Sequence, residues 1–194
     1  MGKKKISVTR KIKRIDDDAE TDGRKISAGE AVRLLFHNEI DTYWQHTTWK
    51  PERNIPGGKK IHQDKGYDQP EVFWKYYFCK PRGSVYKIFG QPDKLDIPNN
   101  LVIELKTYRY PCNRDRQLLA GWWQAEFYDG ITGLEYYQVH LYNAVTKEME
   151  VMEERKFNLR HFRRNLNAAI ELKIAKQLET NQTLLAAEPA RQVA

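Results

Sequence analysis

Three ionisable side chains stand close together in residues 90–107, which read GQPDKLDIPNNLVIELKT. Glu104 and Lys106 are two positions apart in a run of Leu, Val and Ile, and alternate residues of a strand project from the same face. Asp93 precedes them, and the Asn-Asn pair between favours a turn, so a hairpin would bring Asp93 close to Glu104. Paired carboxylates supply the oxygen ligands that Mg²⁺ prefers, and a lysine beside the ion offsets charge on a phosphate. These residues predict phosphodiester hydrolysis.

Two alternatives stay open for the same residues. A Glu-x-Lys pair on a strand is also typical of a solvent-exposed face, where such a pair contributes less than about 1 kcal/mol. Asp96 is a second candidate for the upstream carboxylate, although Asp93 fits better because it directly follows Pro92 at the end of the preceding strand. We therefore expect Asp93 at the site and Asp96 in the turn.

The order of these motifs resembles that of the PD-(D/E)xK nuclease superfamily. PD at 92–93 and ELK at 104–106 are similar to its signature. The segment GKKIH, which ends at His62, and a glutamine-containing helix after the lysine, RQLLAGWWQAEFY, are similar to the RecB-like branch. The similarity spans about residues 27–142. It implies an α/β fold with a restriction-endonuclease-like core, in which helices flank a central mixed β-sheet.

The resemblance also implies a role for each motif residue. The ligands of a Mg²⁺ or Mn²⁺ ion would be His62, Asp93, Glu104 and the backbone carbonyl of Leu105. Lys106 would position the attacking water or stabilise developing charge, and Gln117 would lie near the lysine as a further catalytic residue. The family's Q-x-x-x-Y pattern fits Gln124 and Tyr128 instead, because Gly121 stands four residues after Gln117. Both glutamines remain candidates, and Gln117 is preferred because it lies near the start of the helix.

The charge of the chain indicates a polyanionic partner. The 194 residues carry a formal net charge of +7, and a basic surface attracts nucleic acid over long distances. Candidate DNA contacts are the basic and aromatic residues close to the motifs, namely Tyr108, Arg109, Arg114, Arg116 and Tyr128. Arg114 and Arg116 are equally well explained as surface or capping residues. The partner that we expect is DNA.

Composition argues against several other classes of protein. No run of about 18 or more apolar residues is present, so we expect no membrane span. The basic N-terminus lacks the apolar region of a secretory signal. Two cysteines, Cys79 and Cys112, stand without metal-type spacing. They indicate a reducing, cytoplasmic location and are too few for an iron–sulfur cluster.

The apolar pattern predicts one folded domain at residues 26–180, between a flexible charged tail at 1–25 and a frayed tail at 181–194. The capping box formed by Ser27 and Glu30 predicts a helix to about residue 45. Strands are expected at about residues 72–79, 84–90, 101–108, 134–146 and 149–153. Further helices are expected at about 115–130 and 158–179, with a short helix or turn near His62.

Together these patterns predict a metal-dependent DNA nuclease of the RecB-like type that acts on single strands or ends. One alternative is a dimeric, structure-specific endonuclease of the Holliday-junction resolvase type, in which a homodimer would pair through the apolar seam of the last helix. The other alternative is a nuclease-like module that binds DNA without cutting it. The residues do not distinguish an exonuclease from an endonuclease.

Overall fold

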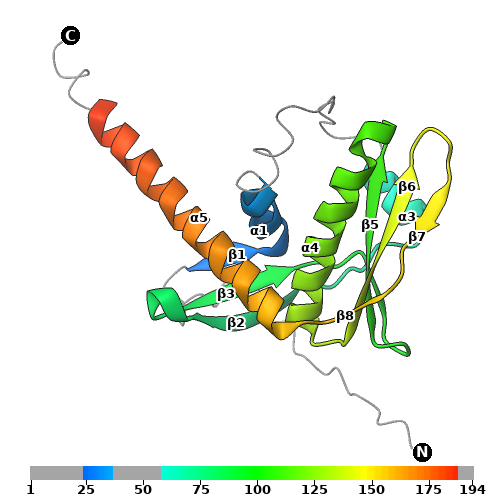
Figure 1. The fold of residues 1–194 in the computed structure, drawn as a ribbon, viewed down its shortest axis with the longest axis horizontal. Coiled ribbons are helices and arrows are strands. Elements are labelled where there is room, and N and C mark those ends of the chain that lie inside the picture. The colour runs from blue at the N-terminus through cyan, green and yellow to red at the C-terminus, as the bar shows by residue number, and fades with distance from the viewer. Residues whose placement is uncertain (1–23, 37–57, 188–194) are drawn as a thin grey trace, which may run out of the picture.

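The computed structural model describes residues 24–36 and 58–187, in which helices and strands are interspersed (Figure 1). Helix α1 (Ala28–Leu35) begins after Ser27, whose Oγ accepts a hydrogen bond from the Glu30 backbone N–H at 3.0 Å. The predicted helix start is therefore confirmed. The remainder of that predicted helix, at 37–45, and the N-terminal tail up to residue 23 lie outside the described residues.

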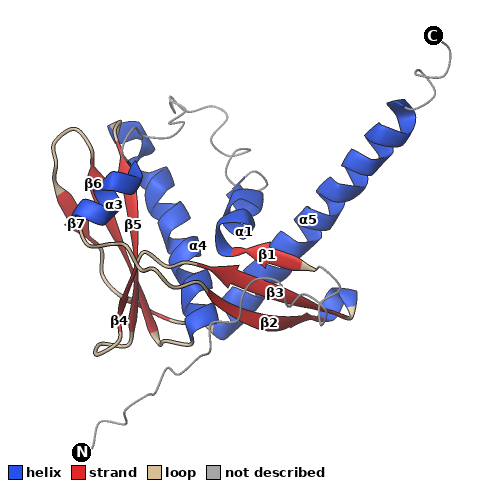
Figure 2. Cartoon of the chain, turned by 180° about the vertical axis from the view of Figure 1, so that it is seen from behind, coloured by secondary structure: helices blue, strands red, loops and turns tan. Residues whose placement is uncertain are grey.

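The strands of the described part form two mixed sheets (Figure 2). The first has the order β1-β3-β2 and consists of β1 (Lys25–Ser27), β2 (Phe73–Cys79) and β3 (Ser84–Gly90). The second has the order β4-β5-β6-β7, with β8 beside β6, and consists of β4 (Lys94–Asp96), β5 (Leu101–Tyr108), β6 (Tyr136–Asn143), β7 (Met149–Val151) and β8 (Arg155–Lys156). The pairs β1–β3 and β5–β6 are parallel, and the other pairs are antiparallel.

Helices flank both sheets. Besides α1 they are α3 (Gly58–Asp64), α4 (Arg114–Thr132) and α5 (Leu159–Ala187), with single 3-10 turns at Lys80–Arg82 and Pro111–Asn113. Helix α4 packs on β5 and β6 and also contacts β2 and β3, whereas α3 lies on the other face of the second sheet (Figure 2). The predicted α/β class, with mixed β-structure flanked by helices, is confirmed. No helix in the described ranges is long and apolar enough to cross a membrane.

Strand β5 is covered on both faces. Val102 belongs to the large apolar cluster that α1, α4 and α5 form with the sheets. Leu101, Ile103 and Leu105 belong to a smaller cluster on the opposite face, together with Tyr67. Because residues 101–105 are all buried, an ionisable side chain in this part of β5 does not face bulk solvent.

The chain passes from the first sheet to the second at Pro92. Proline has no backbone N–H and interrupts a strand ladder, so β3 ends at Gly90 and β4 begins only at Lys94. Asp93 is therefore the last residue before the second sheet, at the point where the two sheets meet.

The ends of the elements differ from the prediction in two respects. Strands β1, β4 and β8 were not predicted, because two or three residues are too few to show an alternating pattern. Helix α5 continues to Ala187, beyond its predicted end near residue 179. The start predicted for the C-terminal tail, residue 181, thus lies inside this helix.

Candidate active site

The hairpin of β4 and β5 places Asp93 beside Glu104. Its antiparallel register pairs Lys94 with Ile103, so one step further the register sets Asp93 opposite Glu104. The ladder ends there, and the Asp93 side chain replaces a backbone partner: its Oδ2 accepts a hydrogen bond from the Leu105 N–H at 2.7 Å. In a strand the N–H and C=O of one residue point to the same side. The Leu105 carbonyl therefore faces the same edge as Asp93.

Glu104 is a buried carboxylate, and only one of its two oxygens accepts a hydrogen bond from the described residues. Its side chain is 1% exposed, and its Oε1 accepts a hydrogen bond from Lys106 Nζ at 2.6 Å. The other oxygen, Oε2, is buried and has no hydrogen-bond partner among the described residues. Burial, followed by the nearby charge of Asp93, raises the pKa of Glu104 to about 8. The surface-pair alternative is therefore wrong, because the Glu104 side chain is buried and does not lie on a solvent-exposed face.

Lys106 is held by two side chains rather than one. Besides Glu104, its Nζ donates a hydrogen bond to Gln124 Oε1 at 2.7 Å. Gln124 Nε2 in turn donates to the Tyr128 hydroxyl at 2.8 Å, and burial, followed by the charge of Glu104, raises the pKa of Tyr128. The glutamine bonded to the lysine is thus Gln124, the candidate that fits the Q-x-x-x-Y pattern. Gln117 lies two turns earlier on α4 and lines a cavity of about 250 Å³ together with Lys106 and Gln124.

Two glycines allow α4 to approach the site closely. A Cβ atom on Gly121 would lie 2.7 Å from Val139 Cγ1 and 3.1 Å from Lys106 Cγ. A Cβ atom on Gly90 would lie 2.5 Å from the Tyr128 ring. Real Cβ contacts are longer than this, so glycine at these positions lets the helix that carries Gln124 lie directly on the strands. The sequence did not predict this role for either glycine.

His62 approaches the site from α3. Its Nδ1 lies 3.1 Å from Asp93 Oδ1, which makes it a neighbour of one carboxylate. Within residues 24–36 and 58–187, no three His, Cys, Asp or Glu side chains are grouped closely enough to hold a metal ion by themselves. The predicted fourfold donor set is therefore brought together only in part, with the contact of His62 to Asp93 as its observed histidine–carboxylate pair.

The remaining donors suit a hard cation. Mg²⁺ is typically bound through one or two carboxylates and keeps several waters. Asp93, Glu104 and the Leu105 carbonyl provide that kind of oxygen set. Glu104 Oε2 has no partner within the described part of the chain, and the pKa of this carboxyl group is raised. Both features are expected at a site where a bound cation would balance the negative charge.

A second polar group, not predicted from sequence, lies near Asp93. The Tyr67 hydroxyl contacts Nδ1 of His140, whose Nε2 lies 2.9 Å from Gln138 Oε1. Burial and the charge of Asp93 raise the pKa of Tyr67. This contact could be recognised only from the sheet register, which pairs Leu105 of β5 with His140 of β6.

The residues predicted to contact DNA are in varied surroundings. The Tyr108 hydroxyl donates to Glu150 Oε1 at 2.9 Å, and Arg114 binds both oxygens of the same carboxylate. Tyr108 and Tyr128 are 6% and 5% exposed, so neither ring offers a surface for stacking. Arg114 is already engaged by protein carboxylates, which favours its alternative, structural role.

Arg116 and Arg109 remain candidates for contact with nucleic acid. Arg116 lies over the Phe36 ring at 5.0 Å from its centroid and lines the cavity that contains Lys106. Arg109 is half-buried, one residue beyond β5.

The Asp96 side chain contacts the turn residue Asn99 instead of the candidate site. Its Oδ2 accepts a hydrogen bond from Asn99 Nδ2 at 2.8 Å, and its Oδ1 accepts one from the Asn99 N–H at 3.3 Å. These contacts stabilise the turn between β4 and β5, as predicted for Asp96. The carboxylate that lies next to Glu104 is that of Asp93.

Similar folds occur among solved structures, although no family model and no curated protein matches the sequence. The crystal structure of SSO0001 has 18% sequence identity and a TM-score of 0.54, and the match covers 77% of this chain and 76% of that one. An alkaline exonuclease, LHK-Exo, from Laribacter hongkongensis matches at 11% identity and a TM-score of 0.44, over 87% of this chain and 95% of that one. A phage-related exonuclease from Haemophilus somnus 129PT matches at 10% identity and a TM-score of 0.47, over 79% and 83%. The likeness to SSO0001 shows a shared fold.

Proposed function

We propose that this protein is a metal-dependent DNA nuclease whose active site consists of Asp93, Glu104 and Lys106. The observation that carries the proposal is the burial of the Glu104 carboxylate close to the charge of Asp93. One Glu104 oxygen accepts a hydrogen bond from Lys106, and the other has no hydrogen-bond partner among the described residues. Such an arrangement is costly for stability, and a cation that binds both carboxylates would offset the cost. The order of the motifs, similar to that of PD-(D/E)xK nucleases, supports the same function.

Asp93, Glu104 and the Leu105 carbonyl would hold Mg²⁺ or Mn²⁺. When bound, such an ion supplies Lewis acidity to the scissile phosphate and lowers the pKa of water. His62 orients the Asp93 carboxylate through the Nδ1–Oδ1 contact of 3.1 Å. The Leu105 N–H fixes the second oxygen of the same carboxylate at 2.7 Å, so Asp93 has little freedom to rotate.

Lys106 supplies a fixed positive charge where negative charge develops on the phosphate. The Gln124 amide and Glu104 hold its ammonium group in place, so little reorganisation is needed as the reaction proceeds. The Tyr128 hydroxyl anchors Gln124 from behind. This arrangement needs no covalent intermediate, because water is the nucleophile.

RecB-like action on single strands or ends is the finer part of the proposal. The glutamine helix after the lysine supports it, since Gln124 and Tyr128 lie next to Lys106 in the Q-x-x-x-Y spacing. His62 beside Asp93 supports it as well.

Cleavage of labelled DNA by the purified protein tests the proposal. Linear single-stranded, linear double-stranded and closed circular DNA are incubated with Mg²⁺, Mn²⁺ or EDTA, and Glu104→Gln is the control variant. Wild type should cut with Mg²⁺ or Mn²⁺ and not with EDTA, and Glu104→Gln should not cut. Cleavage of closed circles would assign an endonuclease.

Two results would contradict the proposal. DNA binding without cleavage in either metal would favour the non-catalytic module. Equal cleavage by Glu104→Gln would place the activity elsewhere. A dimer in light scattering, together with cutting at branched DNA, would favour the resolvase-type alternative.

A further inference from the structure

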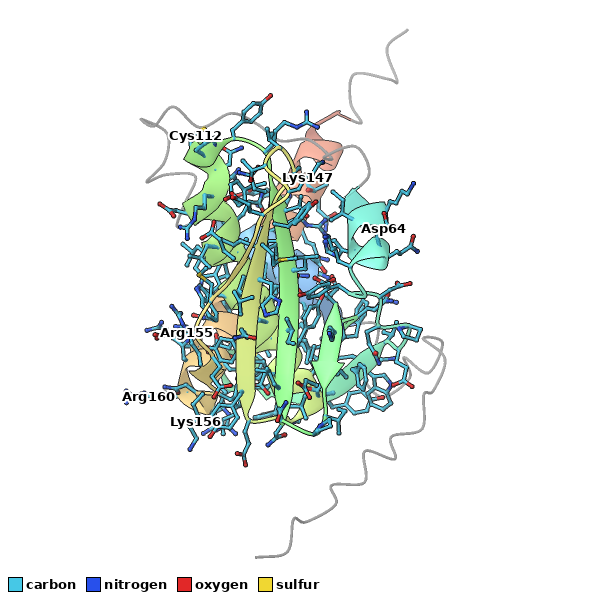
Figure 3. All side chains as sticks on the ribbon, turned by 90° about the vertical axis from the view of Figure 1, so that its right-hand side faces the viewer. Asp64, Cys112, Lys147, Arg155, Lys156 and Arg160 are labelled. Atoms are coloured by element: carbon cyan, nitrogen blue, oxygen red, sulfur yellow. The ribbon has the colours of Figure 1, made fainter. Side chains whose placement is uncertain are left out.

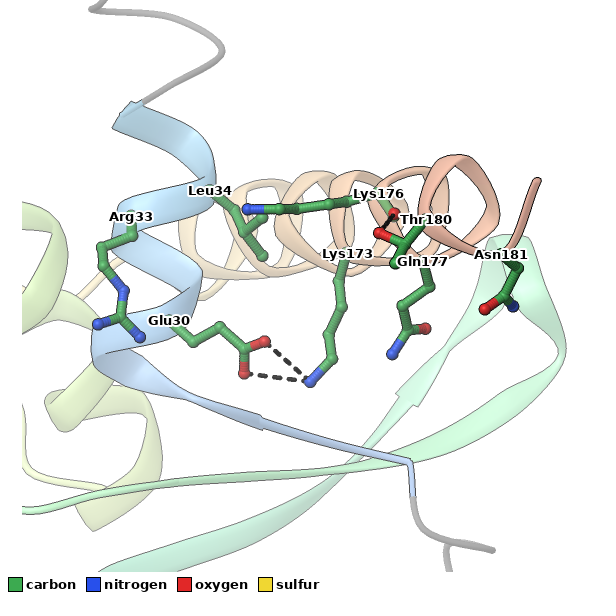
Figure 4. A pocket seen from close by; sticks show the side chains of 8 residues that line it. All are labelled: Glu30, Arg33, Leu34, Lys173, Lys176, Gln177, Thr180 and Asn181. Carbon is green, nitrogen blue, oxygen red and sulfur yellow. Dashed lines mark hydrogen bonds and ion pairs between the residues drawn. The ribbon is translucent and has the colours of Figure 1, made fainter. Parts of the chain in front are cut away.

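A groove runs between side chains of α1 and α5, outside the Asp93–Glu104–Lys106 site described above (Figure 4). Its volume is about 620 Å³. Side chains from both helices line it, namely Glu30, Arg33, Leu34, Lys173, Lys176, Gln177, Thr180 and Asn181. Leu34 is the one apolar residue of this set, and the other side chains end in charged, amide or hydroxyl groups.

The charge of the groove is positive. Its single carboxylate, Glu30, is neutralised by Lys173, whose Nζ lies 3.0 and 3.1 Å from the two Glu30 oxygens. Arg33 and Lys176 are exposed, and neither side chain has an ion pair within the described part of the chain. Two cations without an ion pair among the described residues thus line the groove, one from each helix.

The groove and the cavity at the candidate active site share one lining residue, Arg33. Arg33 lines both spaces, the groove on one side and on the other the cavity formed with Lys106, Gln117 and Gln124. A chain-like polyanion with one phosphate at Lys106 would therefore meet the Arg33 side chain on its way towards Lys176.

The neutral polar side chains of the groove match the same kind of ligand. Gln177, Thr180 and Asn181 carry amide and hydroxyl groups, which together with Arg and Lys make most protein contacts to nucleic-acid phosphates and sugars. A volume of about 620 Å³ is that of a small-ligand pocket. An open groove of this size is compatible with a single strand.

We propose that the α1–α5 groove binds the sugar-phosphate backbone of a single DNA strand that leads to or from the active site, with Arg33 as the link between the two. The path past Lys106 rests on the proposed nuclease function. The groove itself is a binding surface that can be measured without any cleavage.

Binding of a fluorescein-labelled thymidine 20-mer in EDTA, followed by fluorescence anisotropy over a range of salt concentrations, tests the proposal. The variant is Arg33→Gln with Lys176→Gln, which removes one arginine and one lysine from the groove. The matched control is Arg160→Gln with Lys156→Gln. It removes the same charges from an exposed basic surface at the start of α5, where Arg155, Lys156 and Arg160 lie close together (Figure 3).

Wild type should bind the 20-mer with an affinity that falls as salt rises. The groove variant should bind about tenfold more weakly, and the slope of log affinity against log salt should decrease by about 1.4, because each phosphate contact to a single strand contributes about 0.7. The control should change the affinity less than about threefold and the slope by less than about half as much.

The proposal is overturned if wild type does not bind the 20-mer, if the groove variant binds like wild type, or if the control loses as much affinity as the groove variant. Failure of the nuclease proposal gives a different pattern. Wild type would then leave DNA uncut with Mg²⁺ and Mn²⁺, while the groove variant would still show reduced binding in EDTA.

Discussion

The carboxyl group of Asp129 should make the stability of this protein depend on pH. Asp129 lies near the end of α4, is 0% exposed, and neither of its side-chain oxygens has a hydrogen-bond partner within the described ranges. Burial, followed by the charges of Glu126 and Glu135, raises the pKa of Asp129 from 3.8 to about 8. The folded chain therefore keeps a proton on this group at a pH where the unfolded chain has lost it.

The sign and size of the effect follow from that difference. The contribution of Asp129 to stability is complete below pH 3.8 and is lost as the pH rises through about 8. Each pH unit in this interval lowers the free energy of unfolding by about 1.4 kcal/mol. At neutral pH the loss relative to acid solution is up to about 4 kcal/mol, a large part of the stability of an ordinary domain.

Urea denaturation of Asp129→Asn at several pH values measures the effect. The amide keeps the shape and cannot ionise, so the variant should gain stability relative to wild type as the pH rises from about 5 to about 8. Any cost of an unsatisfied amide is the same at every pH, so the slope carries the test. Asp68→Asn, at an exposed position, is the control and should show no such slope. A difference between Asp129→Asn and wild type that does not change with pH would refute the reasoning.

Three further predictions concern the candidate active site. Lys106→Met should lower the free energy of unfolding by about 3 kcal/mol at about pH 9, where the Glu104 carboxyl group (pKa about 8) is ionised in the wild type and would lose its charged partner. A second change, Glu104→Gln, should restore most of that loss in urea denaturation at the same pH, and additive losses would argue against a coupled pair. Gln124→Ala should slow single-turnover DNA cleavage about tenfold, because Lys106 loses the side chain that positions it. The affinity for DNA should stay within about twofold of wild type. An unchanged cleavage rate would show that the Gln124 amide is dispensable. Gly121→Ala should destabilise the fold by about 1–3 kcal/mol, because the new Cβ would lie 2.7 Å from Val139 Cγ1; an unchanged thermal midpoint would contradict the close approach of α4.

The elements that carry the site could be predicted because each has a strong local signal. The run of β-branched and leucine residues before Glu104 is long enough to show alternation, and β5 is formed by the predicted residues. The turn signal at the Asn pair and the two-residue spacing of Glu104 and Lys106 then determined which side chains share a face. The choice of Asp93 over Asp96 followed from its G-x-P-D placement, directly after Pro92 at the end of the preceding strand.

The rest could not be predicted because it depends on packing between distant segments. The preference for Gln117 came from its place near the start of the helix. The contact of Lys106 with Gln124 instead depends on how far α4 slides along β5, which Gly121 permits. The Tyr67–His140 contact depends on the register of β6 against β5, for which a single strand carries no signal.

The predicted contacts of Tyr108 and Tyr128 with DNA rested on their proximity to the motifs in the sequence. A residue next to a catalytic motif can face away from the ligand, and both tyrosine rings are buried. The burial of Glu104 could not be predicted either, because the sequence pattern alone does not show that α4 covers this face of β5.

The most direct test of the proposed active site is single-turnover cleavage of labelled DNA by two matched variants, Asp93→Asn and Asp96→Asn, in Mg²⁺. The two carboxylates are three residues apart, but one contacts the Leu105 N–H beside Glu104 and the other stabilises a turn. The proposed site predicts that Asp93→Asn lowers the rate at least about a hundredfold and that Asp96→Asn cleaves within about threefold of wild type. Cleavage by Asp93→Asn at the wild-type rate, or an equal loss in both variants, would contradict it.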